Sequence, residues 1–332
     1  MPLDAIIGHA PAVALLRGAV RRGRVPQSLL FAGPAGVGKR AVAVALAQAV
    51  NCPVRRKHAG DDACGTCLVC QRIARGQHTD VALIDRGDDA SIKIKQLRER
   101  VLDVIGYRPF EGERRVFIID SADELTPEAQ DALLKTLEEP PPSAILILVT
   151  AYPDTLNATT QSRCRRVRFG PLAEADIVRV LSERLGIEPT QARALAAVSG
   201  GSIGRALAAQ GRDLTADRAA ALALVAAGRG RVGDRLKAAA RLADHNSERR
   251  AREALGDRLA IVASLLRDLG ILAAQSSSTL ANGDFEDHLR GLSSVYDLAR
   301  VTGGYETISR AQEALERNAS PKIVADWVAV TI

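Results

Sequence analysis

Seven residues near the start of the chain have the types and spacing of a phosphate-binding loop. The run GPAGVGK, from Gly33 to Lys39, matches the pattern G-x-x-x-x-G-K. Its glycines, which include Gly36 and Gly38, let backbone N–H groups curl around phosphate oxygens, and the lysine adds a point charge. The run follows an apolar strand pattern and precedes a helical one. We therefore expect a phosphate-loop fold rather than a chance glycine-rich turn.

The residues around this loop lack two groups that ATP hydrolysis needs. The position after the lysine, where Ser or Thr holds Mg²⁺ in a working loop, is Arg40. Asp120 ends the run VFIID as a metal-side carboxylate, but Ser121 follows where a water-activating Glu is expected. The sequence predicts a degenerate pocket that can bind ATP or ADP without requiring it, and in which hydrolysis has failed. The alternative is that Asp123 or Glu124 takes over the missing role.

Four of the five cysteines are close together in the sequence. They are Cys52, Cys64, Cys67 and Cys70. In a cytosolic protein this density indicates metal binding rather than disulfides, and four thiolates suit a closed, structural Zn²⁺ site. An iron–sulfur cluster competes, but its bacterial pattern needs a further cysteine at position 74, which is Ala74. Buried thiols without a metal are the third alternative, and His58 lies nearby but is not expected to be a ligand.

The chain around these residues has the pattern of a parallel sheet covered by helices, which makes the fold class α/β. Apolar runs that end at polar or glycine-rich turns predict strands at 28–33, 115–120 and 144–150, and a weaker one at 79–85. Helical patterns lie between them at 40–50, 94–105 and 127–137. Thr126 is the expected N-cap of the last helix.

The strand patterns stop after Phe169, so we expect a change of architecture there. The predicted domains are a nucleotide-binding-fold domain over 1–170 with its four-cysteine module at 52–70, a helical lid over 171–208, and an all-helical domain over 209–332.

Composition narrows the partners. The net charge of +6 is compatible with a polyanion. Aromatic residues make up only 3%, which disfavours a stacking platform for single-stranded nucleic acid, so phosphates are the expected target of any DNA contact. No run approaches the ~18 apolar residues of a membrane span, and the start lacks a signal-peptide pattern. We expect a cytoplasmic protein with no membrane partner.

Four features together resemble the bacterial clamp-loader family of AAA+ proteins. They are the loop GPAGVGK, the four-cysteine insert, the run DALLKTLEEPP at 131–141 and the run QSRC at 161–164. The resemblance covers about the first 210 residues. It implies a subunit of the DNA polymerase III holoenzyme, with a C-terminal collar that joins tau/gamma and delta subunits in a ring. Such a ring opens a sliding clamp and places it on primed DNA.

Two further residues acquire a role through this resemblance. In the family, the arginine of Ser-Arg-Cys projects into the ATP site of the adjacent subunit, and Arg163 matches it. An arginine finger of this kind stabilises charge on the transferring phosphoryl group. Thr150 lies where the family places a phosphate-sensing residue. The alternatives are a surface arginine in a basic strand and an ordinary threonine at a strand end.

The departures from the family pattern favour the delta-prime type of subunit. Besides Arg40 and Ser121, Gly204 stands where the lid motif Gly-Ser-hydrophobic-Arg places an arginine, and Arg205 follows it about 100° further around a helix. Three active-site features are thus lost while Arg163 is retained. The main alternative is an ATP-hydrolysing tau/gamma-type motor, and a weaker one is a nucleotide-gated DNA-binding module without ring partners.

Overall fold

The chain forms two compact units, Met1–Asp176 and Ile177–Ile332. The computed structural model describes residues 1–57, 60–87, 89, 91–210, 214–243, 248–276, 280, 282–316 and 319–332. The predicted division at residues 170 and 208 stays a prediction.

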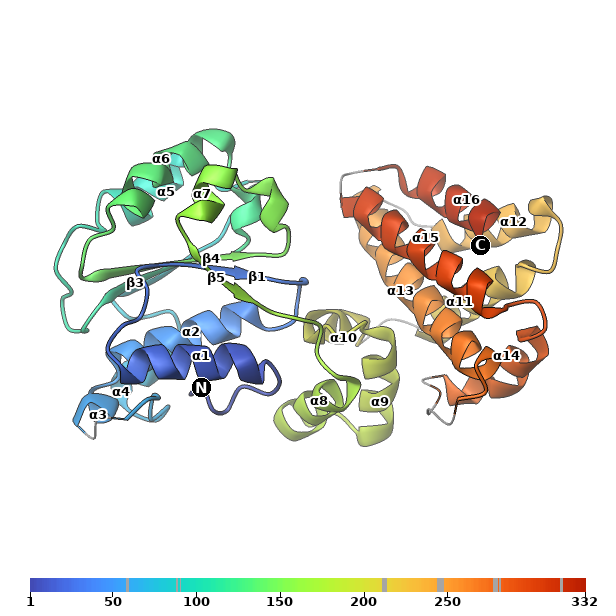
Figure 1. The fold of residues 1–332 in the computed structure, drawn as a ribbon, viewed down its shortest axis with the longest axis horizontal. Coiled ribbons are helices and arrows are strands. Elements are labelled where there is room, and N and C mark those ends of the chain that lie inside the picture. Colours follow the sequence, from blue (N-terminus) through green and yellow to red (C-terminus); the bar gives the residue numbers. More distant parts are fainter. Residues whose placement is uncertain are drawn as a thin grey trace. The chain divides into compact units, whose positions relative to one another are not determined.

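A five-stranded parallel sheet forms the centre of the first unit (Figure 1). Its strands are β1 (Ser28–Ala32), β2 (Val81–Ile84), β3 (Arg115–Ile119), β4 (Ala144–Thr150) and β5 (Arg165–Arg168). Their order is β2-β3-β4-β1-β5, and every neighbouring pair is parallel. The predicted α/β class and the four predicted strands are confirmed. The carboxyl ends of the strands meet at one edge, where ligands bind in folds of this class.

Helices cover both faces of this sheet. They are α1 (Ala10–Arg21), α2 (Lys39–Asn51), α3 (Pro53–Lys57), α4 (Leu68–Ala74), α5 (Ile94–Leu97), α6 (Pro127–Glu138) and α7 (Ala158–Ser162). Side chains alternate along β1, so that Leu29 and Phe31 pack with α1, α2 and α4, whereas Leu30 packs with α5 and α6. Helices α1, α2 and α4 lie on one face of the sheet, and α5 and α6 lie on the other (Figure 1). Two hydrophobic cores therefore pack against the sheet, one on each face, and fix the position of its carboxyl edge.

Two helix predictions can be compared directly with the structure. Thr126 caps α6 as expected, because its Oγ1 accepts a hydrogen bond from Ala129 N at 3.3 Å. The helix predicted over 94–105 is α-helical only to Leu97 and then widens into the π-helical turn η1 (Arg98–Leu102). Leu97, Val101 and Ile105 all reach the core.

All the secondary structure in the described part of the second unit is helical. Its elements, starting at the boundary, are α8 (Glu174–Arg179), η4 (Val180–Arg184), α9 (Pro189–Val198), α10 (Ile203–Ala209), α11 (Leu214–Ala227), α12 (Val232–Ala243), α13 (Glu248–Ala273), η5 (Gly283–Phe285), α14 (Glu286–Leu292), α15 (Leu298–Glu316) and α16 (Pro321–Thr331). Gly204 and Arg205 lie in the first turn of α10, where Ser202 Oγ accepts from Arg205 N at 3.2 Å. In the part of the chain that is described, no helix has the length and apolar character needed to cross a membrane.

Candidate functional site

The phosphate loop connects β1 to α2 at the carboxyl edge of the sheet. Gly33 N donates to Thr150 O at 3.3 Å, which ties the loop to the end of β4. A Cβ at Gly33 would lie 2.1 Å from the backbone oxygen of Phe169, so no other residue fits there. Gly36 and Gly38 have φ values of 72° and 102°, a region that glycine occupies without strain. The local backbone explains why each predicted glycine is a glycine.

A cavity of about 920 Å³ opens beside this loop. It is lined by five of the residues predicted to bind nucleotide or its metal, namely Gly36, Gly38, Lys39, Asp120 and Thr150. They come from α2 and its preceding loop and from the ends of β3 and β4. The structure thus brings these candidates together around one space, and Gly33 begins the loop that borders it. A polyphosphate fits this combination of glycine-rich backbone and lysine.

The Lys39 side chain is folded back onto its own loop. Its Nζ donates to the carbonyl oxygens of Gly33 and Pro34, both at 2.6 Å, and the residue is only 6% exposed. Burial lowers the pKa of its ammonium to about 8, although the carboxylates of Asp123 and Asp120 oppose this shift. A polyphosphate that enters the loop has to compete with these carbonyls for the ammonium.

The acidic side chains that line the cavity are all engaged. Asp120 Oδ2 lies 3.3 Å from Arg40 NH1, and Asp123 Oδ1 accepts from Thr150 Oγ1 at 2.6 Å and from Ala151 N at 3.2 Å. Glu124 Oε2 lies 3.4 Å from the Nε of Arg86, which lies shortly after β2. A divalent cation needs several oxygen ligands, and the Arg40 guanidinium already pairs with the carboxylate of Asp120, which is the main candidate ligand. The residues present do not fit Mg²⁺.

His9 also contributes to this region, although no sequence pattern singles it out. It lies at the N-terminus of α1 in a left-handed conformation with φ 54°. Its Nε2 lies 2.8 Å from Val37 O in the phosphate loop, and its ring packs edge-on against Phe169 at 5.0 Å between centroids. A lone histidine far from the motif carries no local pattern, and only the folded chain reveals this support for the loop.

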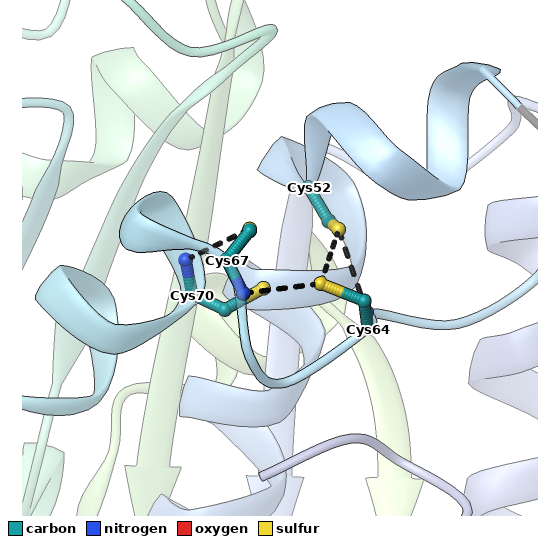
Figure 2. Close-up of side chains that lie close together, drawn as sticks. All are labelled: Cys52, Cys64, Cys67 and Cys70. Atoms are coloured by element: carbon teal, nitrogen blue, oxygen red, sulfur yellow. Dashed lines mark hydrogen bonds between the residues drawn. The ribbon is translucent and has the colours of Figure 1, made fainter.

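The four predicted cysteine ligands form one cluster (Figure 2). Cys52 follows α2, Cys64 lies in the connecting loop, and Cys67 and Cys70 lie at the start of α4. The Sγ atoms all lie within 4.8 Å of one another, and those of Cys52 and Cys64 are 3.6 Å apart. A tetrahedral zinc site with bonds of ~2.3 Å places sulfurs about 3.8 Å apart. The cluster could hold a metal ion, while His58 lies outside the described residues.

Backbone donors surround these sulfurs. Cys52 Sγ accepts from Arg55 N and from Cys64 N at 3.4 Å each, and Cys64 Sγ accepts from Cys67 N at 3.3 Å. Burial raises the pKa of the Cys64 thiol, but N–H donors from Cys67 and Thr66 outweigh it and lower the pKa to about 6. Burial raises the pKa values of Cys67 and Cys70 above the usual range. Donors of this kind stabilise thiolates and orient them toward a metal.

The fifth cysteine belongs to the hydrophobic core instead. Cys164 is buried beneath the sheet face that α5 and α6 cover, and burial raises its pKa to about 12. It lies apart from the cluster of four, so a substitution of Cys164 is a control for substitutions in the cluster.

Arg163 lies on the surface at the end of α7, just before β5. Its NH2 donates to Glu138 Oε1 at 2.6 Å and its NH1 to Thr159 O at 2.9 Å. The Arg163 side chain remains 34% exposed despite these contacts. The guanidinium is therefore held in a defined position and is still accessible from outside the unit.

Comparisons with known proteins identify the family. The profile of the family described as "DNA polymerase III, delta subunit" matches residues 8–173, which is half of the chain. The chain belongs to this family. The predicted resemblance is thereby confirmed, and the matched range contains the phosphate loop, the cysteine cluster and Arg163.

Individual relatives carry two different names. The tau subunit of DNA polymerase III from Bacillus subtilis is 33% identical over 209 residues, which are 61% of this chain and 36% of that protein. The delta' subunit from the same organism is 34% identical over 182 residues, covering 55% of this chain and 53% of that protein. The chain thus spans between a third and about half of these relatives. A gamma subunit-related protein of known structure from Thermotoga maritima is 18% identical, with a TM-score of 0.38 over 95% of this chain and 97% of that one.

Proposed function

We propose that this chain is a delta-prime-type subunit of a bacterial replicative clamp loader. It joins tau/gamma and delta subunits in a ring that places a sliding clamp on primed DNA. This chain contacts the DNA through its phosphates. It hydrolyses little or no ATP itself and donates Arg163 to the ATP site of the adjacent subunit. A cytoplasmic location belongs to the same proposal.

The observation that carries this proposal is the contact between Arg40 and Asp120. In a working site these two positions hold the magnesium ion. Here they form an ion pair of 3.3 Å, while Ser121 supplies no carboxylate for activating water. At the same time Arg163 stays exposed outside its own cavity. A subunit that assists hydrolysis in its neighbour needs an exposed arginine and can lose its own magnesium site.

We also propose that Zn²⁺ fills the four-cysteine cluster. The donor set, the spacing of the sulfurs and the surrounding N–H donors support this ion. Bound there, it supplies cross-links between the end of α2 and the start of α4. All four positions are taken by protein, so the metal has a structural role only.

An ATP-hydrolysing motor of the tau/gamma type is the second candidate. Tau relatives match this chain about as well as delta' relatives do, at 33% and 34% identity. ATP turnover by the purified chain alone separates the two candidates. A rate that is abolished by Lys39→Ala supports the motor, and turnover at background level supports the delta-prime type.

The donated arginine is tested in the reconstituted ring. Arg163→Ala is expected to lower DNA-stimulated ATP turnover, because the neighbouring site loses a contribution of about 10³-fold or more. Assembly, followed by size-exclusion chromatography, should be retained. Arg165→Ala, which removes an exposed arginine two residues away on β5, is the matched control and should leave turnover intact. Unchanged turnover in Arg163→Ala rejects the assignment.

A further inference from the structure

The pair formed by Arg40 and Asp120 also has a meaning for the ligand of the cavity. Arg40 lies in the first turn of α2, directly after Lys39, and Asp120 directly follows β3. The two side chains are 53% and 21% exposed. Ion pairs between side chains that are exposed to this extent contribute little to stability. Holding the fold together is therefore a poor explanation for an arginine at this position.

The position of the guanidinium suggests what it does instead. It borders the same cavity as Lys39 and the phosphate-loop glycines, beside the carboxylate that would otherwise hold a metal ion. An arginine carries five N–H donors in a rigid fork, and the contact with Asp120 uses one of them. Guanidinium groups pair readily with phosphate oxygens, often through two parallel hydrogen bonds.

The charges of the cavity point the same way. Asp120 is neutralised by Arg40, and Asp123 is held by Thr150 and the backbone at Ala151. The metal ion of an ordinary site offsets part of the negative charge of the phosphates. Here the Arg40 guanidinium occupies the position of the metal ion, so an incoming polyphosphate can contact Arg40 and Lys39 without a metal ion.

We propose that the cavity is a magnesium-independent site for the polyphosphate of a nucleoside di- or triphosphate, with the Arg40 guanidinium in place of the metal ion. The inference deepens the proposed function, on which it rests in one respect, namely that the pocket binds without hydrolysing. Arg40 is then a phosphate-binding residue, and not only a residue that stands where a magnesium ligand is missing. The role of such a ligand is to hold the phosphate loop and the start of α2 in one conformation.

The test is a titration of the full chain with ADP by isothermal calorimetry, once with excess Mg²⁺ and once with EDTA. The wild-type chain should bind ADP with the same affinity in both buffers. Arg40→Thr restores a hydroxyl that can ligate Mg²⁺ and removes the guanidinium. It should bind about tenfold more weakly in EDTA, the loss expected for one charge-assisted hydrogen bond, and should recover affinity when Mg²⁺ is added.

Two further variants complete the design. Arg24→Thr removes the same charge from an exposed position after α1, away from the cavity lining, and should behave as the wild type in both buffers. Arg40→Lys keeps the charge but loses the fork, so its binding should be weaker and still independent of Mg²⁺. Circular dichroism of each variant shows whether it is folded, and Arg40→Lys decides the question if Arg40→Thr is not.

The proposal is overturned if wild-type binding requires Mg²⁺, if ADP does not bind in either buffer, or if Arg40→Thr binds as tightly as the wild type in EDTA. These outcomes are distinct from a failure of the proposed function. Magnesium-dependent binding would reject the Arg40 site and leave the donated Arg163 untouched. Unchanged turnover of a ring that carries Arg163→Ala would reject the delta-prime role and leave the ADP measurements standing.

Discussion

At the scale of single residues, the phosphate loop satisfies the charge of Lys39 with its own carbonyl groups. The ammonium is buried and bound by two loop carbonyls at 2.6 Å. Its pKa of about 8 means that a fraction is already neutral slightly above physiological pH. Only the protonated form attracts phosphate, and phosphate in turn favours protonation. Binding above the pKa is therefore coupled to uptake of a proton.

This coupling predicts a pH-dependent affinity for ADP. The charged fraction of the lysine falls about tenfold between pH 7 and pH 9, so affinity should fall about tenfold over this range, mostly above pH 8. Lys39→Arg keeps its charge over this range and should remove the dependence. Calorimetric titration at pH 7, 8 and 9 measures both chains. A wild-type affinity that stays level up to pH 9 contradicts the role given to this lysine.

At the scale of elements, the cysteine module ties several segments of the first unit together. Gln48 Nε2, on α2, donates to Cys70 O at 2.6 Å on α4. Asp62, two residues before Cys64, accepts from the backbone N–H groups of Leu3 and Asp4 at 2.9 and 2.7 Å. A metal ion bound in the cluster would therefore stabilise the end of α2, α4 and the first residues of the chain at the same time.

Loss of the metal should accordingly weaken the first unit as a whole. Cys67→Ser is expected to reduce the zinc content from one ion per chain to a small fraction. It should also lower the unfolding temperature by about 10 °C, because metal-binding free energy is here folding free energy. Elemental analysis and thermal unfolding measure the two effects.

The fifth cysteine gives the control for this experiment. Cys164→Ala removes a buried thiol from the core without touching the cluster, so the zinc content should stay at one ion per chain. Equal zinc content in Cys67→Ser and the wild type would rule out the proposed ligand set. Iron in place of zinc would favour the iron–sulfur alternative.

At the scale of the whole molecule, the parts that were predictable from sequence are those with local patterns. Buried strands such as 144–150 are continuous apolar runs, and the phosphate loop and the cysteine spacing are short motifs. Strand β5 was indicated only as a basic strand beside Arg163 and not as part of the sheet, because only Val167 of its four residues is buried and arginines dominate its pattern. For the 209–332 region the helical class was predictable, but no local signal indicated how its helices pack.

Contacts between distant residues were beyond local reasoning. Arg40 and Asp120 are 80 residues apart, and each could be recognised only as a departure or a remnant of a motif. The sheet brings them together because α2 starts, and β3 ends, at the same carboxyl edge. His9 reaches the phosphate loop across 28 residues for a similar reason. The sequence therefore indicated where the site departs from the motif, and the fold shows that Arg40 and Asp120 are in contact there.

The central claim concerns the division of labour between this chain and its neighbour in the ring. It is that the chain has given up its own ATP chemistry and retains a guanidinium for the adjacent site. Lys39 serves the chain's own cavity, and Arg163 lies exposed outside it. Substituting each in turn separates the two sites within one assembly.

The most direct measurement is the DNA-stimulated ATP turnover of the reconstituted clamp loader that carries either Lys39→Ala or Arg163→Ala in this subunit. The account predicts that Lys39→Ala leaves turnover near the wild-type rate, whereas Arg163→Ala lowers it strongly with assembly intact. The reverse result, with turnover lost in Lys39→Ala and kept in Arg163→Ala, would show that this chain hydrolyses ATP itself and would contradict the account.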